Sequence, residues 1–421
     1  MKLHGKNPRA KFGHMRAETS ERAGKSSRGT TQSGVRLYNE RLVLSLIRKH
    51  QSLPKAEIAR LTGLSAQTVS VIVRQLEGDG LLLKGDPQRG KVGQPLVPFT
   101  LNPDGAFSIG VKVGRRTGEV TLLDLTGAVR QSYVKSYRFP LPSGVVGFVR
   151  EGLAAVTADL GKRQRDRIAG LGIAAPFELW NWEEELGAPK GALQAWRDFD
   201  LKTEIAGLCD WPVLFCNDAT AACSAELFFG KGAGYRDFAY FYVGFFVGGG
   251  VVLNGAIYQG HGGNAGAVGS IPVPSSGGTE QLIRHASVYV LENMVAAAGL
   301  DPATIDRERD NWNDAGDVLD RWIAETSASL AHAILSTTAV LDLEAAIIDG
   351  ALPQEVRAKL IAAVREHYSR LDSRGVAPVA ILEGSIGRDA RAMGAASLPL
   401  FANFMIDRDV LFKEAPDAQG T

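Results

Sequence analysis

Polar side chains that can bind a nucleic acid are concentrated on one face of a predicted helix near the N-terminus. They are Gln67, Thr68, Ser70 and Arg74. Such groups hydrogen-bond to base edges and bind phosphates. The opposite face is apolar and has the i, i+3, i+4, i+7 spacing of an amphipathic helix. Its residues are Val69, Ile72, Val73 and Leu76. The pattern predicts a helix that buries one side and leaves the polar side available to DNA.

Two further helices are predicted to support this one. Lys55–Thr62 forms the helix directly before it, and Arg36–His50 supplies core contacts behind both. The apolar side of the shorter helix comprises Ile58, Ala59 and Leu61. Gly63 can take the positive φ that ends a helix, and Ser65 is placed to cap the next one, so we count Ser65 among the DNA-binding candidates. Two helices around a short turn indicate a helix-turn-helix, whose second helix enters the major groove. An ordinary helical hairpin is the alternative for this stretch alone.

A hairpin after the second helix would complete a winged helix-turn-helix. Leu81–Lys84 and Leu96–Leu101 are the predicted strands, and the glycine-rich Gly85–Pro95 joins them. Arg89 and Lys91 at this turn could lie along the phosphates or in the minor groove. A solvated hairpin without a DNA contact is the alternative.

The distribution of charge agrees with a DNA-binding N-terminal end. The net charge of the chain is only +1, but residues 1–96 carry a net charge of +11 and the rest carries −10. Lys and Arg release counterions from a duplex, so this asymmetry suits phosphate binding. Residues 1–34 are polar and basic and are predicted to be a disordered tail.

Composition also excludes several classes of protein. No apolar run approaches the roughly 18–20 residues of a membrane-spanning helix, and the start lacks the apolar core of a signal peptide. A cytoplasmic protein without a membrane partner is therefore expected. The three cysteines, Cys209, Cys216 and Cys223, have neither CxxC spacing nor nearby histidines, which indicates reduced thiols rather than a zinc site. We expect no metal and no cofactor.

From Ala106 onward, predicted strands alternate with predicted helices, which indicates an α/β architecture. The predicted strands are Ser108–Val113, Glu119–Leu125, Ile168–Ala174, Trp211–Phe215, Ala239–Phe246, Gly250–Leu253, Ala345–Ile348 and Pro378–Leu382. The predicted helices are Ser143–Leu160, Ala219–Phe229, Glu280–Gly299, Gly316–Leu341, Pro353–Leu371 and Asp389–Phe404.

Four segments in this order resemble the ROK family of bacterial sugar-responsive repressors and sugar kinases. They are Gly170–Pro176, Phe215–Glu226, Leu253–Ser270 and Gly384–Ala395. The resemblance extends from about Arg36 to Phe404 and matches the repressor branch of the family. It implies a winged helix-turn-helix followed by a two-lobed, actin/hexokinase-like (ribonuclease H-like) ATPase-type body. The implied divisions are a basic tail (1–34), a winged helix-turn-helix (35–97), a first lobe (98–218 with about 388–410) and a second lobe (219–387).

The chain departs from the family kinases at both phosphate turns. The first turn normally carries Asp-x-Gly-Gly-Thr, but here Lys112 replaces the acidic residue and Arg115 and Arg116 replace small ones. The second is normally Gly-Thr-Gly, but here Phe245 and Phe246 follow the first glycine, and the later Gly248–Gly250 run is expected to serve a tight strand turn. Close approach of the backbone to phosphate is needed at such loops. The protein is therefore not expected to be an enzyme.

The sugar site implied by the resemblance is only partly retained. Asn217 and Asp218 match a family pair that hydrogen-bonds sugar hydroxyls, with the aspartate as general base in the kinases. The alternative role of Asp218 is to cap the helix Ala219–Phe229. The family's glutamate and zinc-binding histidine are replaced by Ala267 and Ser270, and its zinc loop lacks cysteine here. Asn264, His261 and Glu280 are the possible substitutes, and Ile283 aligns about as well as Glu280 with the family's later glutamate.

These observations predict a DNA-binding transcriptional regulator, more specifically a repressor. Its expected partners are a double-stranded DNA operator, a small carbohydrate effector bound between the lobes and a second copy of the chain, as a homodimer or a dimer of dimers. Two alternatives stay open. One is an ATP-dependent sugar kinase with a DNA-binding appendage, and the other is a dimeric regulator that binds no ligand.

Overall fold

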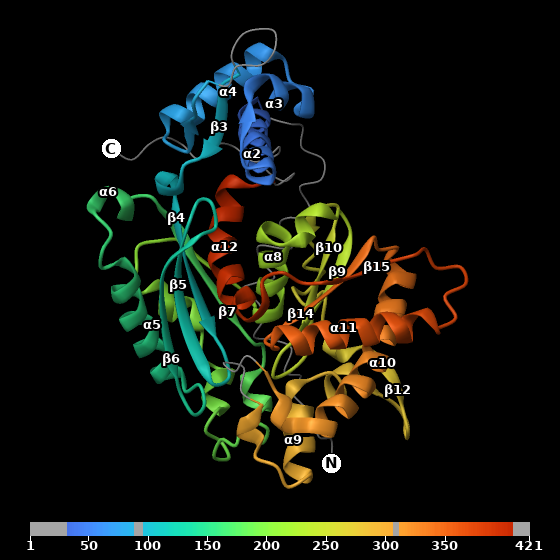
Figure 1. Cartoon of the computed structure of the whole chain (residues 1–421). Coiled ribbons are helices and arrows are strands. Elements are labelled where there is room, and N and C mark those ends of the chain that lie inside the picture. The colour runs from blue at the N-terminus through green and yellow to red at the C-terminus, as the bar shows by residue number, and fades with distance from the viewer. Residues whose placement is uncertain (1–31, 88–95, 306–310, 407–421) are drawn as a thin grey trace, which may run out of the picture.

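The computed structural model describes residues 32–87, 96–305 and 311–406. The first part is a winged-helix domain, drawn in blue at the top of Figure 1. Its helices are α2 (Gln32–His50), α3 (Lys55–Thr62) and α4 (Ala66–Gly78), and its strands are β1 (Leu53–Pro54), β2 (Leu82–Lys84) and β3 (Pro98–Leu101). The strands pair antiparallel in the order β1-β3-β2. The sheet thus ends at Leu101, beyond the end predicted for this domain at residue 97. It also includes a short strand, β1, that the sequence did not predict.

The amphipathic pattern of the helix-turn-helix is confirmed. The apolar stripe of α4 is buried at all four positions, Val69, Ile72, Val73 and Leu76. Gly63 has φ +70° and donates its N–H to the carbonyl of Ala59, which ends α3 in the left-handed conformation that glycine adopts without strain. The prediction was wrong for Leu61, which is 37% exposed rather than part of the apolar core.

The first lobe is built on a five-stranded sheet in the order β6-β5-β4-β7-β8. Its strands are β4 (Phe107–Val113), β5 (Thr117–Asp124), β6 (Val129–Ser136), β7 (Ile168–Ala175) and β8 (Val213–Asn217). The helices α5 (Pro142–Thr157), α6 (Lys162–Arg165) and α7 (Leu201–Ala206) belong to this part of the chain. Strands β4, β5 and β6 are antiparallel, whereas β7 and β8 add in parallel.

The second lobe repeats this topology in the order β11-β10-β9-β14-β15. Its strands are β9 (Phe238–Val243), β10 (Gly248–Leu253), β11 (Ala256–Ile257), β14 (Ala345–Gly350) and β15 (Ala380–Glu383). The helices after α8 (Asp218–Phe229) are α9 (Val288–Ala297), α10 (Gly316–Leu341), α11 (Gln354–Ser369) and α12 (Ala390–Phe404). Three antiparallel strands followed by two parallel ones again make the sheet. Two lobes of the same topology are the actin-like arrangement that the sequence predicted. No helix in the described ranges is both long and apolar enough to cross a membrane.

Two segments differ from the sequence prediction. The predicted helix Glu280–Gly299 is wrong in its first part, because Gly278–Gln281 is strand β13, paired with β12 (Pro272–Ser275), and α9 begins only at Val288. Strand β6 was not predicted, since all its residues but Tyr133 are exposed and it lacks the apolar alternation of a half-buried strand.

Helices α8 and α12 form the centre of the molecule (Figure 1). Helix α12 packs on β4 and β7 of the first sheet and, on its other side, along α8. Glycines make these approaches possible. A Cβ at Gly172 would lie 1.9 Å from the carbonyl oxygen of Ala395, and one at Gly394 would lie 1.8 Å from that of Ala221. Neighbouring elements therefore hold α12 at backbone distance on two sides.

Candidate DNA-binding surface and interlobe site

The exposed face of α4 carries most of the predicted DNA-binding residues. Gln67 and Arg74 are exposed. Ser65 caps the helix, because its hydroxyl accepts the N–H of Thr68 at 3.1 Å and lies 2.8 Å from the Thr68 hydroxyl. These two side chains are thus tied to each other at the start of the helix. Ser70 is partly buried and accepts a hydrogen bond from the Lys55 ammonium at 3.4 Å.

Sequence reasoning missed two residues on this surface. Val71 is 57% exposed, although valine in an amphipathic helix is usually taken as core. It lies between Gln67 and Arg74 at helical spacing i, i+4, i+7, so the three side chains form one row. Lys55 lies beside this row, with its ammonium 5.4 Å from the ring centroid of Phe99. The predicted wing residues Arg89 and Lys91 lie outside the described residues.

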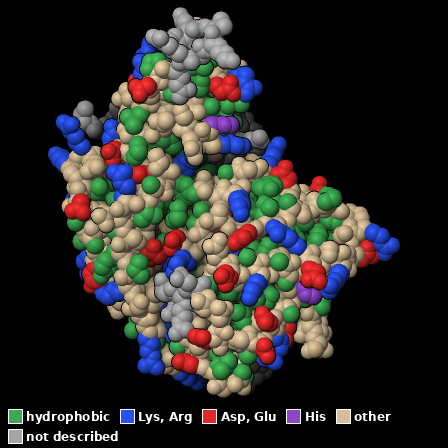
Figure 2. Space-filling view, viewed as in Figure 1, with side chains coloured by type: hydrophobic (Ala, Val, Ile, Leu, Met, Phe, Trp, Pro, Cys, Tyr) green, Lys and Arg blue, Asp and Glu red, His purple; other side chains and the backbone are tan. Residues whose placement is uncertain are grey.

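Surface charge does not single out a second nucleic-acid site on the face shown in Figure 2. Acidic and basic side chains are interspersed over the two lobes in this view. The winged-helix domain therefore remains the candidate on the grounds of its fold and its exposed row of side chains.

The predicted sugar-binding pair lies where α8 begins. Asn217, and not Asp218, is the cap of this helix, and its side-chain oxygen accepts the N–H of Ala219 at 3.0 Å. The predicted alternative role of Asp218 as N-cap is therefore wrong, because the helix starts one residue earlier than expected. Asp218 is buried in the first turn and accepts a hydrogen bond from Nη1 of Arg391 at 3.0 Å.

Arg391 is a buried residue that the sequence analysis missed. It lies in the first turn of α12, 173 residues after its partner Asp218. Its guanidinium also lies 5.0 Å from the ring centroid of Tyr242. Burial disfavours its charged form, but Tyr242 and Asp218 outweigh this effect and raise the pKa of Arg391 above its ordinary value. The sequence offered one signal for this residue, because an arginine is unusual among the alanines and glycine at the start of α12.

The first family phosphate turn is occupied by side chains in this chain. Arg115 lies in the loop between β4 and β5, and its guanidinium is 4.3 Å from the ring centroid of Phe246 and 5.9 Å from that of Phe245. Trp182 packs on Phe246 with ring centroids 4.3 Å apart. The buried Lys112 ammonium lies 3.8 Å from the carboxylate of Glu119. Bulky and charged side chains therefore pack together between the β4–β5 loop and the segment after β9.

The glycines after Phe246 serve close packing in a strand, and the expectation of a tight turn there is wrong. Gly248–Gly250 form the start of β10. A Cβ at Gly250 would lie 2.6 Å from the Cβ of Cys223 on α8, and one at Gly248 would lie 2.8 Å from the Cβ of Ala219. These glycines let α8 lie directly on the second sheet.

The other predicted ligand residues are not gathered with Asp218 by any described contact. Asn264 is exposed in the loop after β11. Glu280 is exposed on β13, where its carboxylate lies 3.1 Å from Nε2 of His285 and 3.0 Å from the hydroxyl of Ser275. Within the described ranges Glu280 therefore belongs to a local hairpin network.

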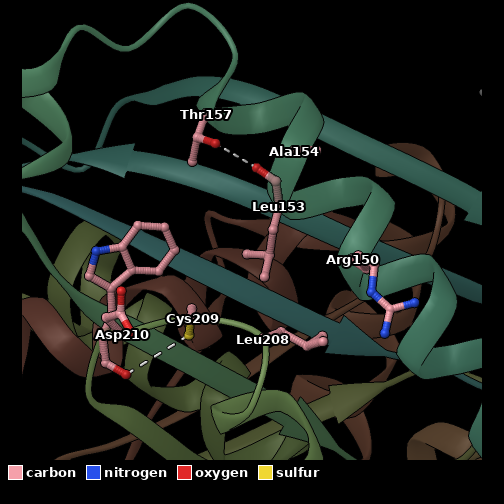
Figure 3. Close-up of a pocket in the computed structure, with 8 residues that line it drawn as sticks. Arg150, Leu153, Ala154, Thr157, Leu208, Cys209 and Asp210 are labelled. Carbon is pink, nitrogen blue, oxygen red and sulfur yellow. Dashed lines mark hydrogen bonds between the residues drawn. The ribbon is translucent and has the colours of Figure 1, made fainter.

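A pocket of about 380 Å³ lies elsewhere, between α5 and the segment that follows α7 (Figure 3). Its lining includes Arg150, Cys209 and Trp211. Helix α5 packs against the side of the first sheet that is opposite to α12, so the pocket is separated from Asp218 by the sheet. The Cys209 thiol at this pocket is 3.9 Å from the carbonyl oxygens of Ile205 and Trp211.

The winged-helix domain is attached to the far ends of α8 and α12. Arg48 of α2 donates to the carbonyl of Leu125 at 2.7 Å and lies 5.2 Å from the ring centroid of Phe229, the last residue of α8. Burial lowers the pKa of Arg48 to about 10, and Asp124 opposes this shift. The residue after α12, Met405, accepts hydrogen bonds from Arg41 and Ser45 of α2 (Arg41 Nη1 to the carbonyl, 3.4 Å; Ser45 Oγ to the sulfur, 3.6 Å).

Comparison with known proteins identifies both parts of the chain. Residues 36–82 match a winged helix-turn-helix DNA-binding family, and residues 108–400 match the ROK family. An uncharacterized protein of Sinorhizobium fredii is 26% identical over 87% of this chain and 91% of its own length. The xylose repressor of Bacillus subtilis is 24% identical over 58% of this chain and 63% of its own length. The transcriptional dual regulator NagC of Escherichia coli is 24% identical over 58% of this chain and 59% of its own length.

Solved structures agree on the fold. A ROK family transcriptional regulator, described as a homologue of the Escherichia coli MLC protein, aligns with a TM-score of 0.65 and 20% identity, covering 90% of this chain and 98% of that one. A ROK glucokinase of Streptomyces griseus with glucose and AMPPNP aligns over 70% of this chain and 99% of its own, with a TM-score of 0.55 and 20% identity. The family match covers most of the chain, and a DNA-binding domain precedes it. The chain therefore belongs to the ROK family and is a DNA-binding transcriptional regulator.

Proposed function

We propose that this regulator is a repressor whose operator binding is controlled by a small ligand, a sugar or sugar derivative, held between the two lobes. The observation that carries the proposal is the course of α8 and α12. Both helices begin at the Asp218–Arg391 pair and both end beneath the winged-helix domain. A change at the pair therefore has a direct structural route to the DNA-binding helices.

The route consists of closely packed elements. At the ligand end, Asp218 opens α8 and Arg391 lies in the first turn of α12. At the other end, the rings of Phe228 and Phe401 lie 4.9 Å apart and hold the two helices together. Leu400 of α12 belongs to the same apolar cluster as the core of the winged-helix domain.

Close packing makes a shift of this helix pair an all-or-none event. A helix held at backbone distance by Gly172 and Gly394 has no free volume into which it can deform. Movement of a lobe would therefore displace α12 as a rigid body and carry α2 with it. A coupling free energy of about 1–3 kcal/mol is sufficient for such a switch.

We further propose that the kinase activity of the fold has been lost. A general base must be free to accept the proton of a substrate hydroxyl, but Asp218 is held by Arg391 at 3.0 Å. Phosphoryl transfer also needs backbone N–H groups around the phosphates, and the resemblance aligns the segments that carry Arg115 and Phe246, whose side chains are in contact, with the two phosphate turns.

DNA recognition is assigned to the row on α4. Gln67 hydrogen-bonds a base edge, Val71 contacts a thymine methyl group, and Arg74 binds a phosphate. Thr68 and Ser65 stabilise the N-terminal turn of α4, and the hydroxyl of Ser70 accepts a hydrogen bond from the Lys55 ammonium. In a homodimer the two α4 helices would meet half-sites about one helical turn, or a multiple, apart.

The test uses the purified full chain and the DNA fragment beside its own gene. We expect a salt-sensitive, sequence-preferring complex. We also expect that a mono- or disaccharide which raises the unfolding midpoint changes the affinity of that complex. With ATP, the same sugars should remain unphosphorylated. Sugar phosphate formation that disappears in Asp218→Asn would instead establish a kinase. A complex that none of the stabilising sugars affects would establish a regulator without a sugar effector.

A further inference from the structure

The Arg115 guanidinium is half-buried and has no hydrogen-bond acceptor among the described residues. Its Nε atom is buried and unpaired. The guanidinium contacts the faces of Phe245 and Phe246 instead. Burial lowers the pKa of Arg115 to about 10, with Asp218 opposing the shift, so the group is still cationic at neutral pH.

The charges that face Arg115 do not supply such an acceptor. They are Asp218, Arg391 and, more weakly, Glu185. The Asp218 carboxylate is already bonded to Arg391, whose own Nε is also buried and unpaired. Two guanidinium groups therefore face one carboxylate that is committed to only one of them.

The position of Arg115 places this charge at the boundary between the lobes. The residue belongs to the β4–β5 loop of the first lobe, whereas Phe245 and Phe246 belong to the β9–β10 turn of the second. A group bound by Arg115 would touch both lobes and would lie next to Arg391, the residue that starts the route to the winged-helix domain.

We propose that the effector of this regulator carries an anionic group, a carboxylate or a phosphate, and that Arg115 binds it. The proposal rests on the proposed function, because it names the chemistry of the ligand at the same site. A guanidinium offers a planar pair of N–H donors that matches the oxygens of either anion. The bound anion supplies the acceptor that Arg115 lacks, and it adds negative charge beside Arg391.

A structural arginine and an anion-binding arginine predict opposite results on removal. If Arg115 mainly stabilised the fold, Arg115→Gln would lower the unfolding midpoint of the free protein. If it binds an anion, the substitution removes a half-buried charge that has no hydrogen-bonded partner, and the free protein keeps its midpoint. Arg116, the exposed neighbour in the same loop, provides the matched control Arg116→Gln.

The experiment measures unfolding midpoints of wild type, Arg115→Gln and Arg116→Gln in sodium phosphate, sodium sulfate and sodium acetate, with sodium chloride at equal ionic strength as reference. A second series compares glucose, glucuronate and glucose 6-phosphate. We expect phosphate or carboxylate compounds to raise the midpoint of wild type and Arg116→Gln. The half-saturating concentration should rise at least tenfold in Arg115→Gln. The two classes of probe decide between a phosphate and a carboxylate.

Equal responses of wild type and Arg115→Gln would overturn the proposal, and so would a stronger response to glucose than to either anionic derivative. A wild-type protein that no anion stabilises beyond chloride would also overturn it. Operator binding without added anion separates this proposal from the proposed function. If neither protein binds the operator, the proposed function fails. If both bind it and the anion responses are equal, only the anion site fails.

Discussion

Replacing Asp218 with asparagine tests the buried pair from which α8 and α12 start. The carboxylate accepts Nη1 of Arg391 at 3.0 Å, and the two side chains are only 11% and 9% exposed. Asparagine has the same shape and retains an oxygen acceptor, but it removes the negative charge. Arg391 and Arg115 would then face each other without a compensating carboxylate. The substitution therefore isolates the effect of charge at this site.

The expected loss can be estimated from the burial of the pair. Removing one partner of a buried pair costs about 3–5 kcal/mol. The lower end, about 3 kcal/mol, is expected here because asparagine still accepts a hydrogen bond and Tyr242 still contacts Arg391. For a lobe of this size each kcal/mol shifts the midpoint by roughly 2–4 °C, so the expected fall is roughly 6–12 °C.

Differential scanning calorimetry of wild type, Asp218→Asn, Arg391→Gln and the double variant measures the coupling between the two residues. The double variant should be less destabilised than the sum of the single variants, because it no longer buries an unpaired charge. Asp210→Asn, at an exposed carboxylate shortly before β8, is the matched control and should leave the midpoint unchanged. A fall below about 1 °C for Asp218→Asn, or additive single effects, would refute the reasoning.

Three further changes probe other parts of the account. Gly394→Ala should lower the free energy of unfolding by about 1–3 kcal/mol in denaturant titrations, because its Cβ would lie 1.8 Å from the carbonyl oxygen of Ala221. The control Gly144→Ala, which has open space around its Cβ, should not lower the free energy of unfolding. Equal stabilities of the two variants would contradict the close packing of α12. Val71→Ala should weaken operator binding about fivefold, as should replacement of the contacted thymine by uracil, and the two losses should not add if the methyl groups touch. Burial raises the pKa of the Cys216 thiol from 9.0 to about 12, so its contribution to stability is present below pH ~9 and is lost as the pH rises toward 12; Cys216→Ala should remove this part of the pH dependence of unfolding, and an unchanged slope would contradict it.

Local patterns in the sequence were sufficient to predict the helix-turn-helix. The stripe of α4 and the left-handed Gly63 depend on neighbours within a few residues, so periodicity and turn chemistry describe them fully. Prediction failed where the local signal was absent. The β12–β13 hairpin has few buried side chains, and its last two residues, Glu280 and Gln281, were assigned to a helix because apolar residues follow them.

The centre of the candidate site depends on contacts that no local pattern encodes. Asp218 and Arg391 are 173 residues apart, and only the folded chain brings them together. The resemblance led us to expect the bulky side chains Arg115 and Phe246 at the two phosphate turns, and this stays a prediction. The sequence could not predict that one packs on the other across the lobe boundary. Val71 was missed because burial, and not residue type, decides which apolar residues of a helix remain exposed.

Operator affinity as a function of salt tests most directly whether α4 is the output of this protein. Fluorescence anisotropy on the DNA beside its own gene would compare wild type with Arg74→Ala, and with Arg374→Ala as a control of equal charge on an exposed loop of the second lobe. We expect Arg374→Ala to behave as wild type. Arg74→Ala should bind more weakly, with the slope of log affinity against log salt reduced by about one, the value for one lost phosphate contact. An unchanged slope and affinity in Arg74→Ala, or no sequence-preferring complex with wild type, would contradict the account.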